Sequence, residues 1–321
     1  EIRHLQKLAT RHAAAAPPTC RAQDKHPTLW HADSGQRVGT YLGHDGATWT
    51  CDISRDSKHL YTGSADSSVR MWDLQTGAEL FKWDYFMPCR SVELSMGEQL
   101  LLLTTDTFMR ESSAVRILRT GDPEAGLEKD EILTIQGKHQ GRITRAVWGP
   151  LNQTIVTAGE EGIIRKFDTE TGKLLEQVDA HELPINTLSV SQDRTHFITA
   201  STDKKSKIYD LHTLKCLKTY AADRPLNGAD MSATHPYVAV GGGQDAAAVT
   251  TTAGQAGKFE ACFYHKYYEA MFATVRGHFG PVNFIAFSPN GRSFTTGGED
   301  GYVRVHHFDK DYYTTDYSRN L

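Results

Sequence analysis

Short apolar runs separated by turn residues recur along the whole chain. Residues 282–287 (Val-Asn-Phe-Ile-Ala-Phe) are rich in apolar residues with a two-residue period, which suits a strand packed on both faces. Pro289-Asn290-Gly291 follows at once and supplies a tight turn. A similar unit spans residues 43–73, where a Gly-His pair precedes two apolar segments. This pattern predicts an all-β chain of short antiparallel strands.

One motif returns at a regular interval. An acidic residue is followed six positions later by a ring-bearing residue in five copies, at positions 24 and 30, 66 and 72, 161 and 167, 203 and 209, and 300 and 306. Two degenerate copies end near Leu118 and Tyr264, so successive copies end 42, 46, 49, 42, 55 and 42 residues apart. A period of about 40–45 residues with four short strands per unit is typical of WD-repeat β-propellers. We therefore predict a seven-bladed WD-repeat propeller over residues 22–313, with an irregular first blade and ring closure. Residues 1–21 form an atypical N-terminal segment and residues 314–321 a C-terminal tail.

The repeated acids and histidines predict a structural network. In each copy the carboxylate lies in a turn, where it can accept backbone N–H bonds and bind the imidazole of a Gly-His pair. We expect His44 to contact Asp66 and His278 to contact Asp300. We also assign Trp72, the ring-bearing residue of its copy, and Asp203, the acidic residue of another copy, to this structural network. Ser64, Asp66 and His44 could also be imagined as a hydrolase triad. The same residue types recur in several copies, however, and no nucleophile elbow, metal-spaced histidine pair or phosphate-binding loop accompanies them. We therefore expect neither an enzyme nor a metal or cofactor site.

The composition of the chain indicates which classes of partner and which cellular compartment to expect. The chain has 35 Lys and Arg against 39 Asp and Glu, a net charge of −4. Broad nucleic-acid binding usually needs a basic excess, so it is not the leading hypothesis, although direct RNA contact stays open. The five cysteines are scattered and odd in number, which disfavours a disulfide framework or a zinc site and indicates a reducing compartment. We expect neither a membrane span nor a secretory signal, and predict a cytoplasmic protein.

Two segments depart from the plain repeat. Residues 106–114 interrupt the third copy. The longer insertion runs from Gln244 to Lys258 in the sixth copy and is rich in Ala, Thr and Gly. Loops of this length in a compact fold are often functional, so Gln244 and Lys258 bound a possible functional loop. A simple hairpin extension is the alternative.

Several strings go beyond a generic repeat. These are Gly-Gly-Gly-Gln-Asp at 241–245, Val-Thr-Thr-Thr at 249–252, Gly-Lys-Phe-Glu-Ala at 257–261, Phe-Tyr-His-Lys at 263–266, Gly-His-Phe-Gly-Pro at 277–281 and Gly-Gly-Glu-Asp-Gly-Tyr-Val-Arg at 297–304. In them the chain resembles the family of the WD-repeat subunit, subunit i, of eukaryotic translation initiation factor three. The resemblance covers roughly residues 24–313; residues 1–21 do not match the family.

The resemblance implies a cytoplasmic, non-enzymatic scaffold that joins subunits b and g of the factor near the small ribosomal subunit. The family's contact for a helix of subunit b includes two acidic positions, which fall on Asp193 and Asp210. A pair of carboxylates suits Lys or Arg on an amphipathic helix. The alternative is that Asp193 only caps a turn and Asp210 is the ordinary repeat aspartate. A generic WD-repeat adaptor in another cytoplasmic assembly is the rival function, and the insertion in the sixth copy disfavours it.

Overall fold

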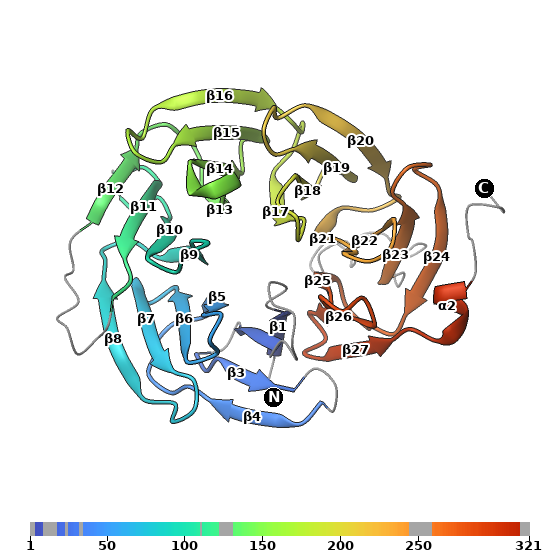
Figure 1. The fold of residues 1–321 in the computed structure, drawn as a ribbon, viewed down its shortest axis with the longest axis horizontal. Helices are drawn as coiled ribbons and strands as arrows, with labels where there is room; N and C mark the ends of the chain where they lie inside the picture. Colours follow the sequence, from blue (N-terminus) through green and yellow to red (C-terminus); the bar gives the residue numbers. More distant parts are fainter. Residues whose placement is uncertain are drawn as a thin grey trace. The chain divides into compact units, whose positions relative to one another are not determined.

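The computed structural model describes residues 4–8, 18–22, 25–31, 35–109, 111–121, 131–243 and 259–314. Within these ranges the chain is almost entirely β-structure, with a single turn of 3-10 helix η2 (Pro150–Asn152) and a short helix α2 (Lys310–Thr314). It divides into two compact units (Figure 1): an N-terminal unit of residues 17–185, and a C-terminal unit of residues 186–321 together with residues 1–16. Among the described residues no helix has the length and apolar character needed to span a bilayer.

The N-terminal unit is built from antiparallel sheets whose strands follow one another in chain order. The first sheet comprises β5 (Thr48–Ile53), β6 (His59–Ser64), β7 (Ser68–Asp73) and β8 (Glu79–Asp84), with β2 (Pro18–Ala22) beside β5. The second comprises β9 (Cys89–Leu94), β10 (Leu100–Thr105), β11 (Ala114–Arg119) and β12 (Glu131–Gln136), and the third β13 (Ile143–Trp148), β14 (Thr154–Gly159), β15 (Ile163–Asp168) and β16 (Leu174–Asp179). A two-stranded ribbon of β3 (Thr28–Trp30) and β4 (Arg37–Thr40) precedes them.

The C-terminal unit repeats the plan. Its sheets are β17 (Ile185–Val190), β18 (His196–Ser201), β19 (Lys205–Asp210) and β20 (Cys216–Ala221); then β21 (Leu226–Met231), β22 (Tyr237–Gly242), β23 (Glu260–His265) and β24 (Met271–Arg276); then β25 (Val282–Phe287), β26 (Ser293–Gly298) and β27 (Val303–His307). β1 (His4–Leu8) lies against this last sheet. The predicted atypical segment at residues 1–21 thus contains strands.

Apolar side chains between consecutive sheets form the cores. In the N-terminal unit, Tyr61 and Met71 of the first sheet pack with Val92 and Leu101 of the second, and all four are buried. In the C-terminal unit, Ile198 belongs to an equivalent buried cluster between its first two sheets. In the sheets with four consecutive strands the second strand is almost completely buried, whereas the fourth is mostly exposed or partly exposed, and β16 is exposed along almost its whole length. Each of these sheets is therefore buried over its inner strands and solvated at its last, as a propeller blade is.

A β-bulge recurs at the second residue of the first strand. The register shifts at this point in the first pairing of five sheets, so that Trp49, Arg90, Thr144, Asn227 and Asn283 each fall in the bulge. A bulge inserts one residue without a partner and re-aims its side chain. In each sheet one side chain near the beginning of the first strand is therefore set apart from the ladder.

Carboxylates tie neighbouring sheets together. In the N-terminal unit, Asp52 accepts a bond from the backbone N–H of Leu94 at 2.8 Å, and Glu93 accepts one from the backbone N–H of Trp148 at 3.3 Å. In the C-terminal unit, Asp230 accepts the backbone N–H of Phe287 at 2.7 Å. These acids are on first strands, so each one fixes the first strand of another sheet.

The predicted all-β propeller architecture is confirmed, but the count of seven blades is not. The described residues form six sheets of three or more strands, and the first predicted repeat, which ends at Trp30, contributes only the two-stranded ribbon β3–β4. The predicted domain boundaries at residues 21 and 313 stay predictions.

Candidate functional site

The two acids singled out by the family resemblance lie at one end of a single sheet. Asp193 is in the turn between β17 and β18, and Asp210 is the last residue of β19. Asp210 is paired across the ladder with His196, the first residue of β18. Asp193 is exposed and Asp210 is partly exposed. The fold therefore brings the predicted pair to the same solvent-facing edge, with an imidazole beside them.

Asp193 is held by its own turn. Its carboxylate accepts the Ser191 hydroxyl at 2.5 Å, and the backbone N–H and hydroxyl of Thr195 at 3.2 and 2.8 Å. Partial burial raises the pKa of Asp193, but these hydrogen bonds outweigh it and the pKa lies below its ordinary value. The carboxylate is thus ionised at neutral pH and fixed in position.

Asp210 is held in the same manner. One oxygen, Oδ1, accepts the backbone N–H of His212 at 2.9 Å, and the backbone N–H and hydroxyl of Thr213 at 2.7 and 2.9 Å. The backbone bond from Thr213 is the largest cause of a lowered pKa. Oδ2 takes part in none of the described bonds, so it can accept a donor from outside.

Among the described residues, a second sheet has the same arrangement. In the β5–β8 sheet, Asp56 accepts the Ser54 hydroxyl at 2.6 Å, and Asp73 accepts the Thr76 hydroxyl at 2.8 Å. His59 is paired with Asp73 as His196 is with Asp210. The structural roles foreseen for Asp193 and Asp210, capping a turn and ending a repeat, are therefore present. Those roles leave part of each carboxylate exposed.

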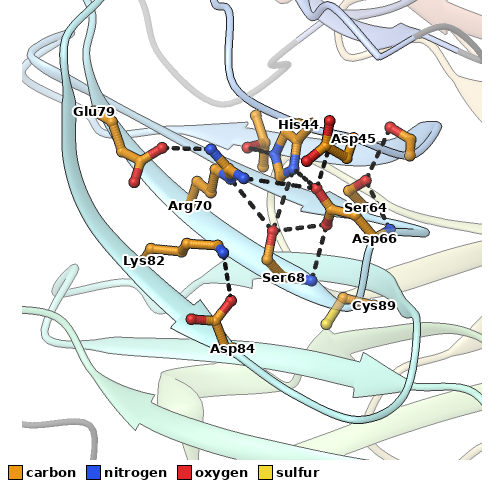
Figure 2. A network of polar contacts seen from close by, with 12 residues as sticks. His44, Asp45, Ser64, Asp66, Ser68, Arg70, Glu79, Lys82, Asp84 and Cys89 are labelled. Carbon is orange, nitrogen blue, oxygen red and sulfur yellow. Dashed lines mark hydrogen bonds and ion pairs between the residues drawn. The ribbon is translucent and has the colours of Figure 1, made fainter.

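His44, Asp66 and Trp72, which the sequence assigned to a structural network, are joined by hydrogen bonds at the first sheet, and Figure 2 shows the contacts of His44 and Asp66. His44 Nδ1 contacts Asp66 Oδ2 at 2.8 Å, and His44 Nε2 contacts the Thr62 hydroxyl at 2.7 Å. Because the carboxylate requires a donor, Nδ1 carries the proton and Nε2 accepts from Thr62. The same hydroxyl accepts the indole N–H of Trp72 at 2.8 Å. Each polar atom in this series, from the Asp66 carboxylate oxygen to the Trp72 indole N–H, therefore has a hydrogen-bond partner.

Asp66 also organises the turn around it. It accepts the backbone N–H of Asp45 at 3.0 Å and the Ser68 hydroxyl at 2.7 Å. Burial raises the pKa of Asp66, but the bonds from His44 and Ser68 outweigh it and lower the pKa far below its usual range. The arrangement has no exposed nucleophile: Ser64 donates to the Gly46 carbonyl at 3.1 Å, and its side chain is fully buried. The geometry supports the structural interpretation of these residues over a hydrolase triad.

Other sheets vary the network. His278 contacts Asp300, the residue expected from the sequence, at 3.0 Å, and it contacts the Thr296 hydroxyl at 2.8 Å. His306 lies in place of the tryptophan, 3.4 Å from the same hydroxyl. Asp203 makes the same kind of turn bond as Asp66, since its carboxylate accepts the backbone N–H of Lys205 at 2.9 Å.

In the β13–β16 sheet, His139 contacts the Thr157 hydroxyl at 3.0 Å and accepts a bond from Arg165 at 2.8 Å. Phe167 there takes the place of the tryptophan. Burial and the neighbouring guanidinium lower the pKa of His139 to about 4, so the ring is neutral at pH 7.

The third repeat, which the sequence showed as degenerate, uses an ion pair instead. Arg90 Nε and Nη2 donate to both oxygens of buried Asp106, at 2.8–2.9 Å. The Arg90 guanidinium also lies over the Trp49 ring, 4.1 Å from its centroid. This stack anchors the start of the eight-residue connection between β10 and β11, where the sequence predicted an interruption.

The remaining predicted loop falls outside the described residues, because Gln244 and Lys258 bound the segment 244–258. No group of three or more potential metal ligands occurs within the parts of the chain that are described. Sequence reasoning missed the bulge residues, which differ from sheet to sheet and so carry no repeat signal. It also missed the inter-sheet carboxylates Asp52, Glu93 and Asp230.

The chain is similar to known proteins over most of its length. A family model described as EIF3I matches residues 19–318. The protein of Homo sapiens named "Eukaryotic translation initiation factor 3 subunit I" is 40% identical over 292 residues, which cover 91% of this chain and 90% of the relative. The proteins of the same name from Neosartorya fischeri and Neurospora crassa are 44% and 43% identical, over 91% of this chain and 88% and 85% of theirs.

Proposed function

The chain belongs to the EIF3I family, that of eukaryotic translation initiation factor 3 subunit I, and on this premise we propose that it is a non-enzymatic, cytoplasmic scaffold subunit of the factor. In this proposal it joins subunits b and g and works beside the small ribosomal subunit. A helix of subunit b docks on the edge formed by Asp193 and Asp210.

The placement of these two carboxylates carries the proposal. Both are ionised, both are fixed by bonds within their own turns, and both face solvent at one end of the β17–β20 sheet. Acids that are already ordered lose little conformational entropy on binding. They suit Arg or Lys side chains on one face of a helix, because charge-assisted hydrogen bonds are about twice as strong as neutral ones.

The test is a pull-down of the full chain with the C-terminal segment of subunit b. We expect the wild type to bind, and the double variant Asp193→Lys/Asp210→Lys to lose binding by about a hundredfold or more. That factor corresponds to about 3 kcal/mol, the scale of one or two hydrogen bonds to charged groups. Circular dichroism and thermal unfolding verify that the variant is folded.

The chain supplies a matched control. Asp56 and Asp73 occupy the equivalent positions of the β5–β8 sheet, with the same turn bonds and a histidine beside them. The variant Asp56→Lys/Asp73→Lys carries the same charge change and should bind like the wild type. An equal loss of binding in both double variants would mean that the overall charge of the protein, not the Asp193/Asp210 site, determines binding. A folded wild type that ignores the segment would refute the Asp193/Asp210 site and favour an adaptor role in another assembly.

We also infer that the propeller has seven blades, with the β3–β4 ribbon as the outer half of the first. The ribbon is followed by a Gly-His pair at residues 43–44, in the way β24 is followed by Gly277-His278. Tyr41, just beyond β4, is buried and donates its hydroxyl proton to the Leu74 carbonyl at 2.9 Å. This bond joins the end of the ribbon to the β5–β8 sheet and supports the assignment of the ribbon to a blade of its own.

A further inference from the structure

Three asparagines at equivalent positions form a hydrogen-bonded series in the C-terminal unit. Asn186 Nδ2 donates to Asn227 Oδ1 at 3.2 Å, and Asn227 Nδ2 donates to Asn283 Oδ1 at 2.8 Å. Asn283 Nδ2 then donates to Glu299 Oε1 at 3.3 Å. Each is the second residue of a first strand, and the bulges at Asn227 and Asn283 set them apart from the ladder. The series therefore ends on a carboxylate.

Glu299 is a half-buried acid with no cation among its described partners. Asn283 is the one side chain described as bonding its carboxylate. By contrast, its neighbour Asp300 pairs with His278 at 3.0 Å and with Arg304 at 2.9 Å. Glu160, at the corresponding position of the β13–β16 sheet, has Arg142 at 3.6 Å. Glu299 thus keeps acceptor capacity, whereas its neighbour Asp300 and the equivalent Glu160 each have a cationic partner.

Two exposed aromatic residues belong to the two segments next to this acid: Phe279 precedes Pro281, whose carbonyl accepts the Glu299 backbone N–H at 3.0 Å, and Tyr302 follows Glu299 by three residues. Phe279 is 84% exposed and Tyr302 is 62% exposed. Their backbone N–H groups donate to the two oxygens of the same carboxylate, Asp300, each at 3.1 Å, so the backbones of the two residues meet at Asp300. The guanidinium of Arg304 lies 5.1 Å from the centroid of the Tyr302 ring, which illustrates the fit of this ring to a planar cation. Aromatic side chains are enriched in protein–protein interfaces.

We propose that Phe279, Asn283, Glu299 and Tyr302, named here the Glu299 corner, bind an arginine side chain on an extended segment of a protein partner. A guanidinium offers five donors in one plane, and the corner offers a carboxylate, a carboxamide oxygen and two exposed aromatic residues on adjoining segments. The carboxylate decides between ligand classes, because it repels the phosphates of RNA and attracts a cation. Lysine matches the charge but not the planar geometry.

The corner is separate from the Asp193/Asp210 edge. Asp193 and Asp210 lie where the first and third strands of their sheet end, whereas Phe279 and Tyr302 lie next to where such strands begin. The two sites are therefore at opposite ends of the strands and can be tested independently.

The test uses NMR of the full ¹⁵N-labelled chain titrated with the peptide acetyl-Gly-Arg-Gly-amide. The matched probe replaces arginine with citrulline, which keeps the shape and loses the charge. We expect saturable shifts of the Asn227 and Asn283 side-chain amides, and of the Phe279 and Tyr302 backbone amides, with the arginine peptide only. Glu299→Gln should weaken binding about tenfold, which corresponds to about 1.4 kcal/mol. Glu160→Gln should leave it unchanged.

Three outcomes would overturn the proposal: no shifts with the arginine peptide, equal shifts with the citrulline peptide, or equal affinity of the Glu299→Gln variant. Single-stranded oligouridine is tested in parallel. If it shifts Phe279 and Tyr302 and binds the Glu299→Gln variant more tightly than the wild type, the surface is a nucleic-acid site instead. Binding of the subunit b segment should survive Glu299→Gln, so failure of this proposal and failure of the Asp193/Asp210 proposal are distinguishable.

Discussion

Replacing Thr62 with valine removes a single hydroxyl and keeps the shape of the side chain. That hydroxyl joins the two halves of the network in the β5–β8 sheet, since it donates to His44 Nε2 and accepts the indole N–H of Trp72. All three side chains are at most 2% exposed, so water cannot replace the lost partner. The substitution therefore leaves one buried acceptor and one buried donor unpaired.

The magnitude follows from these two groups. A buried polar group without a partner costs about 1–3 kcal/mol, and burying a methyl in place of the hydroxyl returns about 1 kcal/mol. We expect the Thr62→Val variant to lose about 2–4 kcal/mol of unfolding free energy. For a chain of 321 residues, an unfolding entropy of about 2.1 cal/mol/K per residue means that 1 kcal/mol changes the melting temperature by about 1.5 °C, so the melting temperature should fall by about 3–6 °C.

The assay is thermal and urea unfolding followed by circular dichroism at pH 7.5, for a double-mutant cycle of Thr62→Val with Trp72→Phe. Removing the indole N–H removes one of the two orphaned groups, so the double variant should lose about 1 kcal/mol less than the sum of the single losses. The chain itself tolerates phenylalanine at the equivalent position, Phe167.

Thr104→Val is the matched control. Thr104 is also a fully buried threonine on a second strand, but its hydroxyl has no hydrogen-bond partner among the described residues. Valine there should be neutral or stabilising. If Thr62→Val changes the melting temperature no more than Thr104→Val does, the network does not contribute to stability and the reasoning is refuted.

Two further predictions concern protonation and thiol access. His139 is neutral in the fold because its pKa is lowered to about 4, whereas an unfolded histidine titrates near 6.5. The contribution of neutral His139 to the unfolding free energy is therefore fully present above pH 6.5, and the unfolding free energy should fall by up to about 3 kcal/mol as the pH drops towards 4. Urea unfolding from pH 7 to 4 measures this slope; a His139→Gln variant with the same slope would assign it to other groups. Cys216 is exposed whereas Cys51 and Cys89 are at most 1% exposed, and burial raises the pKa of Cys89 well above its usual range. Maleimide labelling with peptide mass spectrometry should therefore modify Cys216 in the native protein and the other two only in urea; rapid native labelling of Cys89 would contradict the packing between the first two sheets.

The repeat spacing predicted the architecture because its residues act within one sheet. An acid in a turn and a ring six residues later lie on the same hairpin, so their relation is local and survives in the sequence. For the same reason His44 could be matched with Asp66, and His278 with Asp300. The sequence also marked His306 as the ring-bearing residue of the last repeat, and in the structure it lies 3.4 Å from the Thr296 hydroxyl.

Relations between sheets were not predictable in this way. The bonds from Asn186 to Asn227 and from Asn227 to Asn283 join residues 41 and 56 positions apart, and nothing local distinguishes these asparagines from others. The same holds for Glu93, whose carboxylate bonds a backbone group 55 residues away. Arg90 and Asp106 were missed because they replace the repeated network with a different residue pair.

The recurring bulge has a consequence for how such a chain can diversify. Ladder residues are constrained on both sides, since a change of size or polarity at one of them disturbs a partner strand and a packed face. The bulged residue is exempt from pairing, and each sheet offers one such position at an equivalent place. The five sheets with a described bulge indeed hold tryptophan, arginine, threonine and two asparagines there. Sequence change can therefore accumulate at these positions and alter the chemistry of the surface while the scaffold beneath it stays constant.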